Sequence, residues 1–144
     1  MNLIEWSEKL VVNVKPIDEQ HQQMAKTVNE LYSLLGSQKN EAIKYLVGKF
    51  VNEVKVHFDT EDKLMKVGTF QNYISHKLEH DRFGNEINNF HRKFTKGELK
   101  VNLEFLKSIK QWFFNHIEIN DRKLGVYINS LENKEELLKQ FETN

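Results

Sequence analysis

Four stretches of this sequence carry apolar residues at steps of three and four, which is the period of an amphipathic α-helix. The predicted helices cover residues 17–36, 40–65, 70–94 and 101–129, and a shorter helix is predicted over 133–142. Only short turns separate the long helices, and Gly36, Gly68 and Gly97 fall in these turns. The pattern predicts an all-α fold: a single domain over 1–144, built as an antiparallel up-down-up-down four-helix bundle with an N-terminal arm (1–16) and a short C-terminal helix.

Five of the six histidines lie on the apolar stripes, where a bundle buries its side chains. These histidines are His21, His57, His76, His80 and His116, and the acidic residue Glu61 lies on a stripe as well. One such histidine alone is more often a hydrogen-bonded core residue. Burying them all without partners would cost on the order of 2 kcal/mol each, most of the roughly 5–15 kcal/mol that stabilises a typical fold. A metal ion removes this cost by making each group a ligand, so the set predicts an internal metal site.

The spacing of these residues also suits metal binding. On the second and on the third predicted helix, two members of the set are four residues apart, so each pair projects from one helix face. Asp121 follows His116 by five residues, which on a regular α-helix turns the two side chains about 140° apart. The apolar stripe slips by one residue at this point, and a single π-bulge near 117–121 would explain the slip and turn Asp121 inward. His91, which precedes two basic residues, is predicted to lie outside the site.

The amino-acid composition restricts which metal ligands the chain can offer and which partners it can bind. The chain has no cysteine, which excludes disulfides, thiolate zinc sites and iron–sulfur clusters, so any metal is held by nitrogen and oxygen. Its 21 basic and 21 acidic side chains balance, so the chain has no excess positive charge with which to bind nucleic acid. No apolar run is long enough to cross a bilayer, and the N-terminus lacks a signal-peptide core. We therefore expect a soluble cytoplasmic protein with no nucleic-acid partner and no membrane insertion, and we favour a monomer because no partner-binding patch is evident.

The chain resembles the hemerythrin family, especially its single-domain bacterial members, over nearly its whole length. The matching features are Trp6 in the arm, I-D-E-Q-H at 17–21, H-F-D-T-E at 57–61, H-K-L-E-H at 76–80 and W-F-F-N-H-I-E-I-N-D at 112–121. Four ordered motifs with these spacings form a specific signal. The resemblance implies a non-haem di-iron centre, with two iron ions per chain joined by an oxo or hydroxo bridge.

The resemblance also implies a role for each residue of the site. One iron would be bound by His76, His80 and His116, the other by His21 and His57, and both would be bridged by Glu61 and Asp121. The coordination position that stays open on the second iron would take dioxygen. Apolar residues would line that pocket, and the matching positions are Met24, Trp112, Phe113 and Ile117.

The function implied is reversible dioxygen binding for transport, storage or local supply, rather than catalysis. Met24 and Phe113 stand where the family commonly has leucine, Asp62 replaces the second glutamate of the usual pair, and Phe70 and Gln71 replace a frequent Tyr-Pro. None of these departures removes a ligand. The alternatives are a di-iron enzyme or sensor acting on peroxide, nitric oxide or oxygen, and an iron-handling protein. The chain contains no E-x-x-H sequence, which disfavours a carboxylate-rich di-iron oxygenase.

Overall fold

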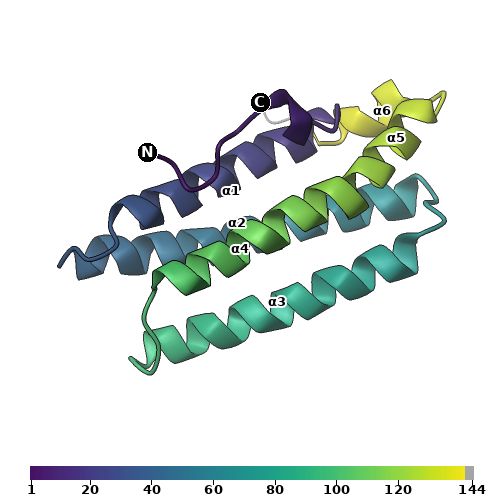
Figure 1. Ribbon diagram of the computed structural model, residues 1–144. Helices are drawn as coiled ribbons and strands as arrows, with labels where there is room; N and C mark the ends of the chain where they lie inside the picture. Colours follow the sequence, from purple (N-terminus) through teal and green to yellow (C-terminus); the bar gives the residue numbers. More distant parts are fainter. Residues whose placement is uncertain (142–144) are drawn as a thin grey trace.

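The computed structural model describes residues 1–141, and all regular structure in this range is helical. The elements are η1 (Glu8–Leu10), α1 (Lys15–Ser33), α2 (Asn40–Val67), α3 (Tyr73–Thr95), α4 (Leu103–Asn115), η2 (His116–Asp121), α5 (Arg122–Ser130) and α6 (Lys134–Lys139). The π-helical segment η2 joins α4 to α5 without a break, so the three form one long fourth helix (Figure 1). Short connections reverse the chain between successive long helices, which therefore run antiparallel (Figure 1). The predicted all-α bundle is confirmed.

Several helix ends differ from the prediction. The first helix starts at Lys15 rather than at 17, because proline is well tolerated in a first helical turn and Pro16 occupies that position. The third starts at Tyr73 rather than at 70, because Phe70 is buried in the preceding turn, where its N–H donates to the carbonyl of Met65. The tail helix predicted over 133–142 is observed as α6, and position 142 lies outside the described residues.

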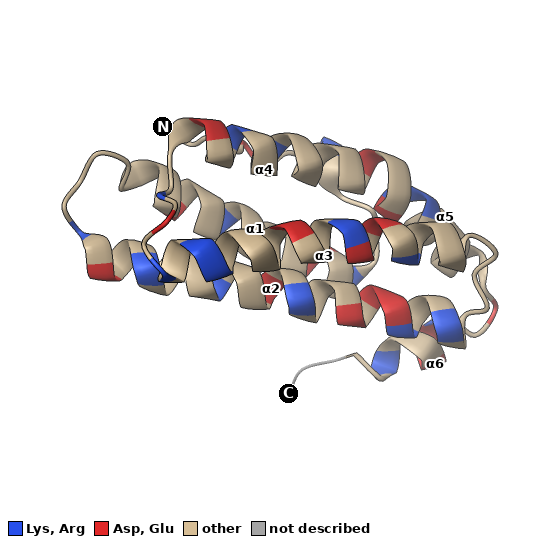
Figure 2. Cartoon of the chain, turned by 90° about the horizontal axis from the view of Figure 1, so that it is seen from below, with Lys and Arg blue, Asp and Glu red and all other residues tan. Residues whose placement is uncertain are grey.

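The buried apolar core lies on both sides of the predicted metal site along the bundle axis. In α2, Val54 is buried one turn before His57, and Leu64 is buried one turn after Glu61. Lysine and arginine are interspersed with acidic residues along the helices (Figure 2). Among residues 1–141, no helix combines the length and the hydropathy needed to span a bilayer.

The N-terminal arm is tied to the fourth helix beside the site. The guanidinium of Arg122 donates to the carbonyls of Lys9 and Val11. A Cβ at Gly125 would come 2.6 Å from the carbonyl oxygen of Val12, so only glycine lets the arm lie this close to α5. Where the arm enters α1, Asp18 accepts from the backbone N–H of Val12 at 2.9 Å. The arm is therefore a packed part of the bundle.

Candidate metal centre

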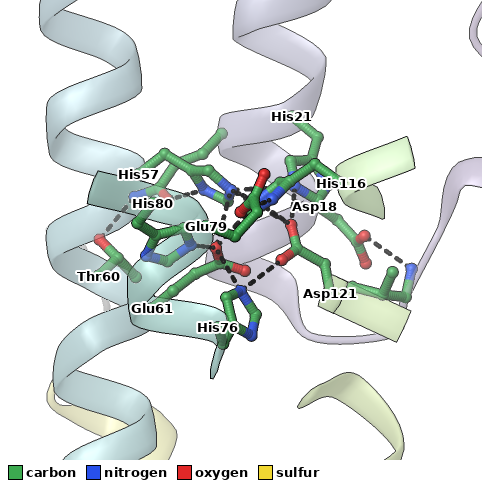
Figure 3. Close-up of polar contacts among 12 residues, drawn as sticks. Asp18, His21, His57, Thr60, Glu61, His76, Glu79, His80, His116 and Asp121 are labelled. Carbon is green, nitrogen blue, oxygen red and sulfur yellow. Dashed lines mark hydrogen bonds and ion pairs between the residues drawn. The ribbon is translucent and has the colours of Figure 1, made fainter. Parts of the chain in front are cut away.

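The structure brings all seven predicted ligands into one cluster inside the bundle (Figure 3). His21 comes from α1, His57 and Glu61 from α2, His76 and His80 from α3, and His116 and Asp121 from η2. Each of the seven side chains is at most 3% exposed. His91 belongs to neither group of donor atoms in this cluster.

The segment η2 explains how Asp121 reaches the cluster. In a π-helix the hydrogen bonds run from residue i to i+5, so residues five apart lie near one face. This wider turn spans His116–Asp121, and both of its end residues are buried. The sequence prediction of a π-bulge near 117–121 is therefore confirmed.

The donor atoms are spaced as neighbouring ligands of a metal ion. Nε2 of His21 lies 3.1 Å from Nε2 of His57 and 2.6 Å from Oδ2 of Asp121. On the other side of the cluster, Nε2 of His80 lies 2.9 Å from Oε1 of Glu61. Adjacent ligands of an octahedral ion with bonds of about 2.1 Å are about 3 Å apart, so these distances suit coordination.

The donors form two overlapping sets. One contains His21 and His57, the other contains His76 and His80, and Glu61, His116 and Asp121 belong to both. Within each set, the donor atoms lie within 4.8 Å of one another. Of the three shared residues, only Glu61 and Asp121 have two oxygens with which to contact two ions, so these carboxylates are the candidates for bridging ligands.

Buried atoms without hydrogen bonds test whether a cation fits. Oε2 of Glu61, Oδ1 of Asp121 and Nε2 of His76 are buried and make no hydrogen bond of suitable geometry within residues 1–141, although the last two atoms lie 3.2 Å apart. Each such atom costs on the order of 1–3 kcal/mol if it stays unsatisfied. A metal ion bound in the cluster would satisfy all three, so the residues present fit a metal.

The electrostatics of the cluster keep both carboxylates ionised and divide the histidines. Burial opposes ionisation of Asp121, but the charge of His116 and the hydrogen bonds from Glu61, His116 and His21 together outweigh this effect and hold the pKa of Asp121 well below its usual range. Burial and Asp121 also raise the pKa of Glu61, yet nearby histidines, His57 first, reverse this and lower it. Burial lowers the pKa of His57, which keeps its imidazole neutral. For His76, His80 and His116 burial also opposes the charged form, but the nearby carboxylates outweigh it and raise the pKa, so a metal competes with protons for these imidazoles.

Two of the histidines are oriented by polar partners on the outer side of the ring. Nδ1 of His57 donates to Oε1 of Gln20 at 2.9 Å, and the amide of Gln20 donates to the hydroxyl of Thr60 at 2.9 Å. Nδ1 of His80 donates to Oδ1 of Asp62 at 3.0 Å. In each case the hydrogen on Nδ1 leaves the lone pair of Nε2 directed into the site.

A third histidine is oriented in the same way by a carboxylate. Nδ1 of His116 donates to Oε2 of Glu79 at 2.9 Å (Figure 3). The other oxygen of Glu79 accepts from Nε1 of Trp112 at 2.8 Å. Neither Gln20 nor Glu79 was identified from the sequence. In the sequence, Gln20 comes directly before His21 and Glu79 directly before His80, and this position next to a histidine is the only sign of their role.

Of the four residues expected to line an oxygen pocket, two have rings that lie against histidines of the cluster. Met24, Phe113 and Ile117 are buried, and the ring of Phe113 lies edge-on to His21 at 5.8 Å between centroids. Trp112 is half-buried and stacks on His116 at 4.9 Å. Phe113 and Trp112 therefore flank different histidines.

A helical bundle that directs buried imidazoles and carboxylates from all its long helices into one cluster is a metal-binding bundle protein. The family model described as Hemerythrin HHE cation binding domain matches residues 12–128, and the chain belongs to this family.

Related sequences and solved structures match this chain over most of its length. It is 27% identical over 126 residues to a bacteriohemerythrin of Methylococcus capsulatus, covering 87% of this chain and 96% of that one. It is 28% identical over 120 residues to a myohemerythrin of Theromyzon tessulatum, covering 83% and 88% of the two chains. Among solved structures, wild-type hemerythrin superposes with a TM-score of 0.82 at 26% identity, covering 86% and 96%. The resemblance seen in the motifs is confirmed.

Proposed function

We propose that this protein binds dioxygen reversibly at a non-haem di-iron centre and serves in oxygen transport, storage or local supply. The observation that carries this proposal is the pair of overlapping donor sets that share two buried carboxylates. Support also comes from relatives named bacteriohemerythrin and myohemerythrin. When bound, two ferrous ions would supply the electrons that dioxygen takes up and returns.

We further propose how the seven side chains divide between the ions. His76, His80 and His116 would hold one iron, His21 and His57 would hold the other, and Glu61 and Asp121 would bridge them together with an oxo or hydroxo group. Two octahedral ions have about twelve coordination positions, of which three bridges fill six and five histidines fill five. One position is then left for dioxygen, beside the two-histidine ion.

In this proposal, Met24, Phe113 and Ile117 keep the dioxygen pocket dry. All three are buried apolar residues, and Phe113 lies edge-on against His21, a ligand of the ion with the open position. Excluding water and acids from such a pocket protects a reduced metal centre from unwanted oxidation. Trp112 has a different contact, since it lies against His116 and Glu79.

An oxygen-consuming enzyme is the main alternative. Such chemistry needs a ligand set that stabilises highly charged metal, and negative ligands do this better than neutral ones. Here five imidazoles accompany only two carboxylates. This ligand set favours reversible binding over oxidation.

The test is a spectroscopic oxygen cycle. Iron-loaded protein is reduced without air, exposed to oxygen and then returned to an oxygen-free atmosphere while its visible charge-transfer spectrum is recorded. Reversible appearance and loss of the band is the expected result. Rapid irreversible oxidation would contradict the carrier function, and an iron content other than about two per chain would contradict the two-ion site.

A further inference from the structure

The outer partners of the ligand histidines differ between the two sides of the cluster. On the side of His80, the Nδ1 hydrogen is accepted by a carboxylate, that of Asp62, at 3.0 Å. His116, proposed for the same ion, donates to a second carboxylate, that of Glu79, at 2.9 Å. Asp62 and Glu79 are themselves half-buried, so water screens their charge only in part.

The side of His57 has no carboxylate in this position. The acceptor for its Nδ1 hydrogen is the neutral amide oxygen of Gln20, whose own N–H is taken up by the hydroxyl of Thr60. Nδ1 of His21 is buried and has no hydrogen-bond partner within residues 1–141. Both histidines of this side therefore lack a negative outer partner among the described residues.

This difference affects how strongly each side attracts a cation. A carboxylate that accepts the outer N–H of an imidazole makes the inner nitrogen a stronger electron donor and adds negative charge near the ion. A neutral amide orients the ring but adds little of either effect. Changing such outer partners commonly alters metal affinity by about 10- to 100-fold.

We propose that Asp62 and Glu79 on one side, and Gln20 on the other, make the two metal positions unequal. The position of His76, His80 and His116 fills first and binds more tightly, and that of His21 and His57 fills second and binds more weakly. The inference rests on the proposed two-iron site. These outer residues are positioning residues, because they act through the histidines.

The test is a calorimetric titration of the metal-free protein with ferrous ion in the absence of oxygen. Wild-type protein should take up two ions in two resolved steps. D62N should weaken the first step by about tenfold or more and leave the second nearly unchanged. Q20E, which places a carboxylate behind His57, should tighten the second step by about tenfold and leave the first nearly unchanged.

Two control variants separate this effect from a change in surface charge. Asp81 contacts the same Lys77 ammonium as Asp62 but touches no ligand histidine, so D81N should leave both steps unchanged. Gln23 lines the same small cavity as Gln20 and does not contact His57, so Q23E should not reproduce the effect of Q20E. A tighter second step in Q20E cannot result from damage to the fold.

The outcomes distinguish this inference from the proposed function. Two ions bound with equal affinity, or variants that shift both steps alike, would overturn the ordering and leave the di-iron site standing. The proposed order of binding is also overturned if D81N weakens the first step as D62N does, or if Q23E tightens the second step as Q20E does. Uptake of a single ion by wild-type protein would overturn the two-ion site and the ordering together.

Discussion

Oδ2 of Asp121 lies 2.6 Å from Nε2 of His21, although 100 residues separate the two in the sequence. On a regular α-helix, Asp121 would point about 140° away from its neighbour in the site, His116. The π-helical turn His116–Asp121 removes this difference and directs both residues toward α1. Such turns are rare in helices and are found frequently at functional sites.

Deletion of Ile119 tests whether this turn serves the site rather than the fold. Ile119 is 55% exposed within η2, and its loss would place Asp121 four residues after His116 on a regular α-helix. The apolar stripe beyond it, with Leu124 and Ile128, would keep its register. We expect cooperative unfolding with a nearly unchanged free energy. Asp121 lies on that same stripe and should still face the site, so ferrous-ion affinity should fall by no more than about tenfold, through the local shift of its carboxylate.

Deletion of Val126 is the matched control. Val126 is 69% exposed but belongs to the regular helix α5, so its deletion would turn Ile128 about 100° away from the core. This variant should lose about 2–5 kcal/mol of unfolding free energy, measured with guanidinium chloride. If deletion of Ile119 were equally destabilising, the π-helical turn would be needed for folding itself.

Replacement of His80 by alanine should remove most of the thermal stabilisation that metal binding gives the protein. A ligand at 100 times its Kd stabilises a folded protein by about 2.7 kcal/mol, so ferrous ion should raise the Tm of the wild-type protein clearly. His80→Ala should lose most of this rise, because His80 belongs to the donor cluster. His91→Ala should keep it, and an equal loss in both variants would contradict the assignment of His91 as a bystander.

The cluster of candidate ligands was predictable because every member interrupts an apolar stripe. His57 and Glu61 stand where helix periodicity requires buried residues, so the sequence itself marks them as unusual. The same periodicity located the π-bulge, because one extra residue in a helical turn shifts every later apolar position by one.

The outer partners were not predictable in the same way. Gln20 and Glu79 lie beside the stripes, where polar residues are ordinary and usually solvated. Their role depends on the distance between neighbouring helices, which brings Gln20 on α1 to His57 on α2. The start of α3 was missed for a similar reason, since Phe70 packs in the core from a turn rather than from a helix.

Metal uptake should depend on pH through His76. Burial alone would lower the pKa of His76, but the carboxylates of Asp121 and Glu61, 3.2 and 3.5 Å from its Nε2, outweigh burial and raise the pKa to about 9. A ferrous ion must displace this proton to bind Nε2, so raising the pH removes a competitor.

The expected dependence follows from at least one released proton, because the pKa of His116 is raised as well. The apparent affinity should rise at least about tenfold per pH unit between about pH 6.5 and 8.5, and it should level off once the pH exceeds the pKa values of these histidines. Anaerobic titrations in buffers of different ionisation enthalpy measure both the affinity and the proton release. An affinity that is independent of pH in this range would show that His76 is already neutral before metal binds.

The packing of the arm beside the site can be tested at Gly125. A methyl group there would come 2.6 Å from the carbonyl oxygen of Val12, which is backbone and cannot rotate away. Gly125→Ala should therefore displace the arm and lower the unfolding free energy by about 1–3 kcal/mol. Faster proteolysis within residues 1–14 should accompany this loss.

Gly48 is a glycine that alanine should replace with a gain in stability. It lies inside α2, and a methyl group there would meet no atom within 4 Å. Gly48→Ala should therefore raise the unfolding free energy by about 0.5–1 kcal/mol, because alanine loses less backbone freedom in a helix. If both alanine variants were stabilising, the close contact between Gly125 and Val12 would not constrain the arm, and the hydrogen bonds that Arg122 and Asn129 donate to arm carbonyls would have to hold it against the fourth helix.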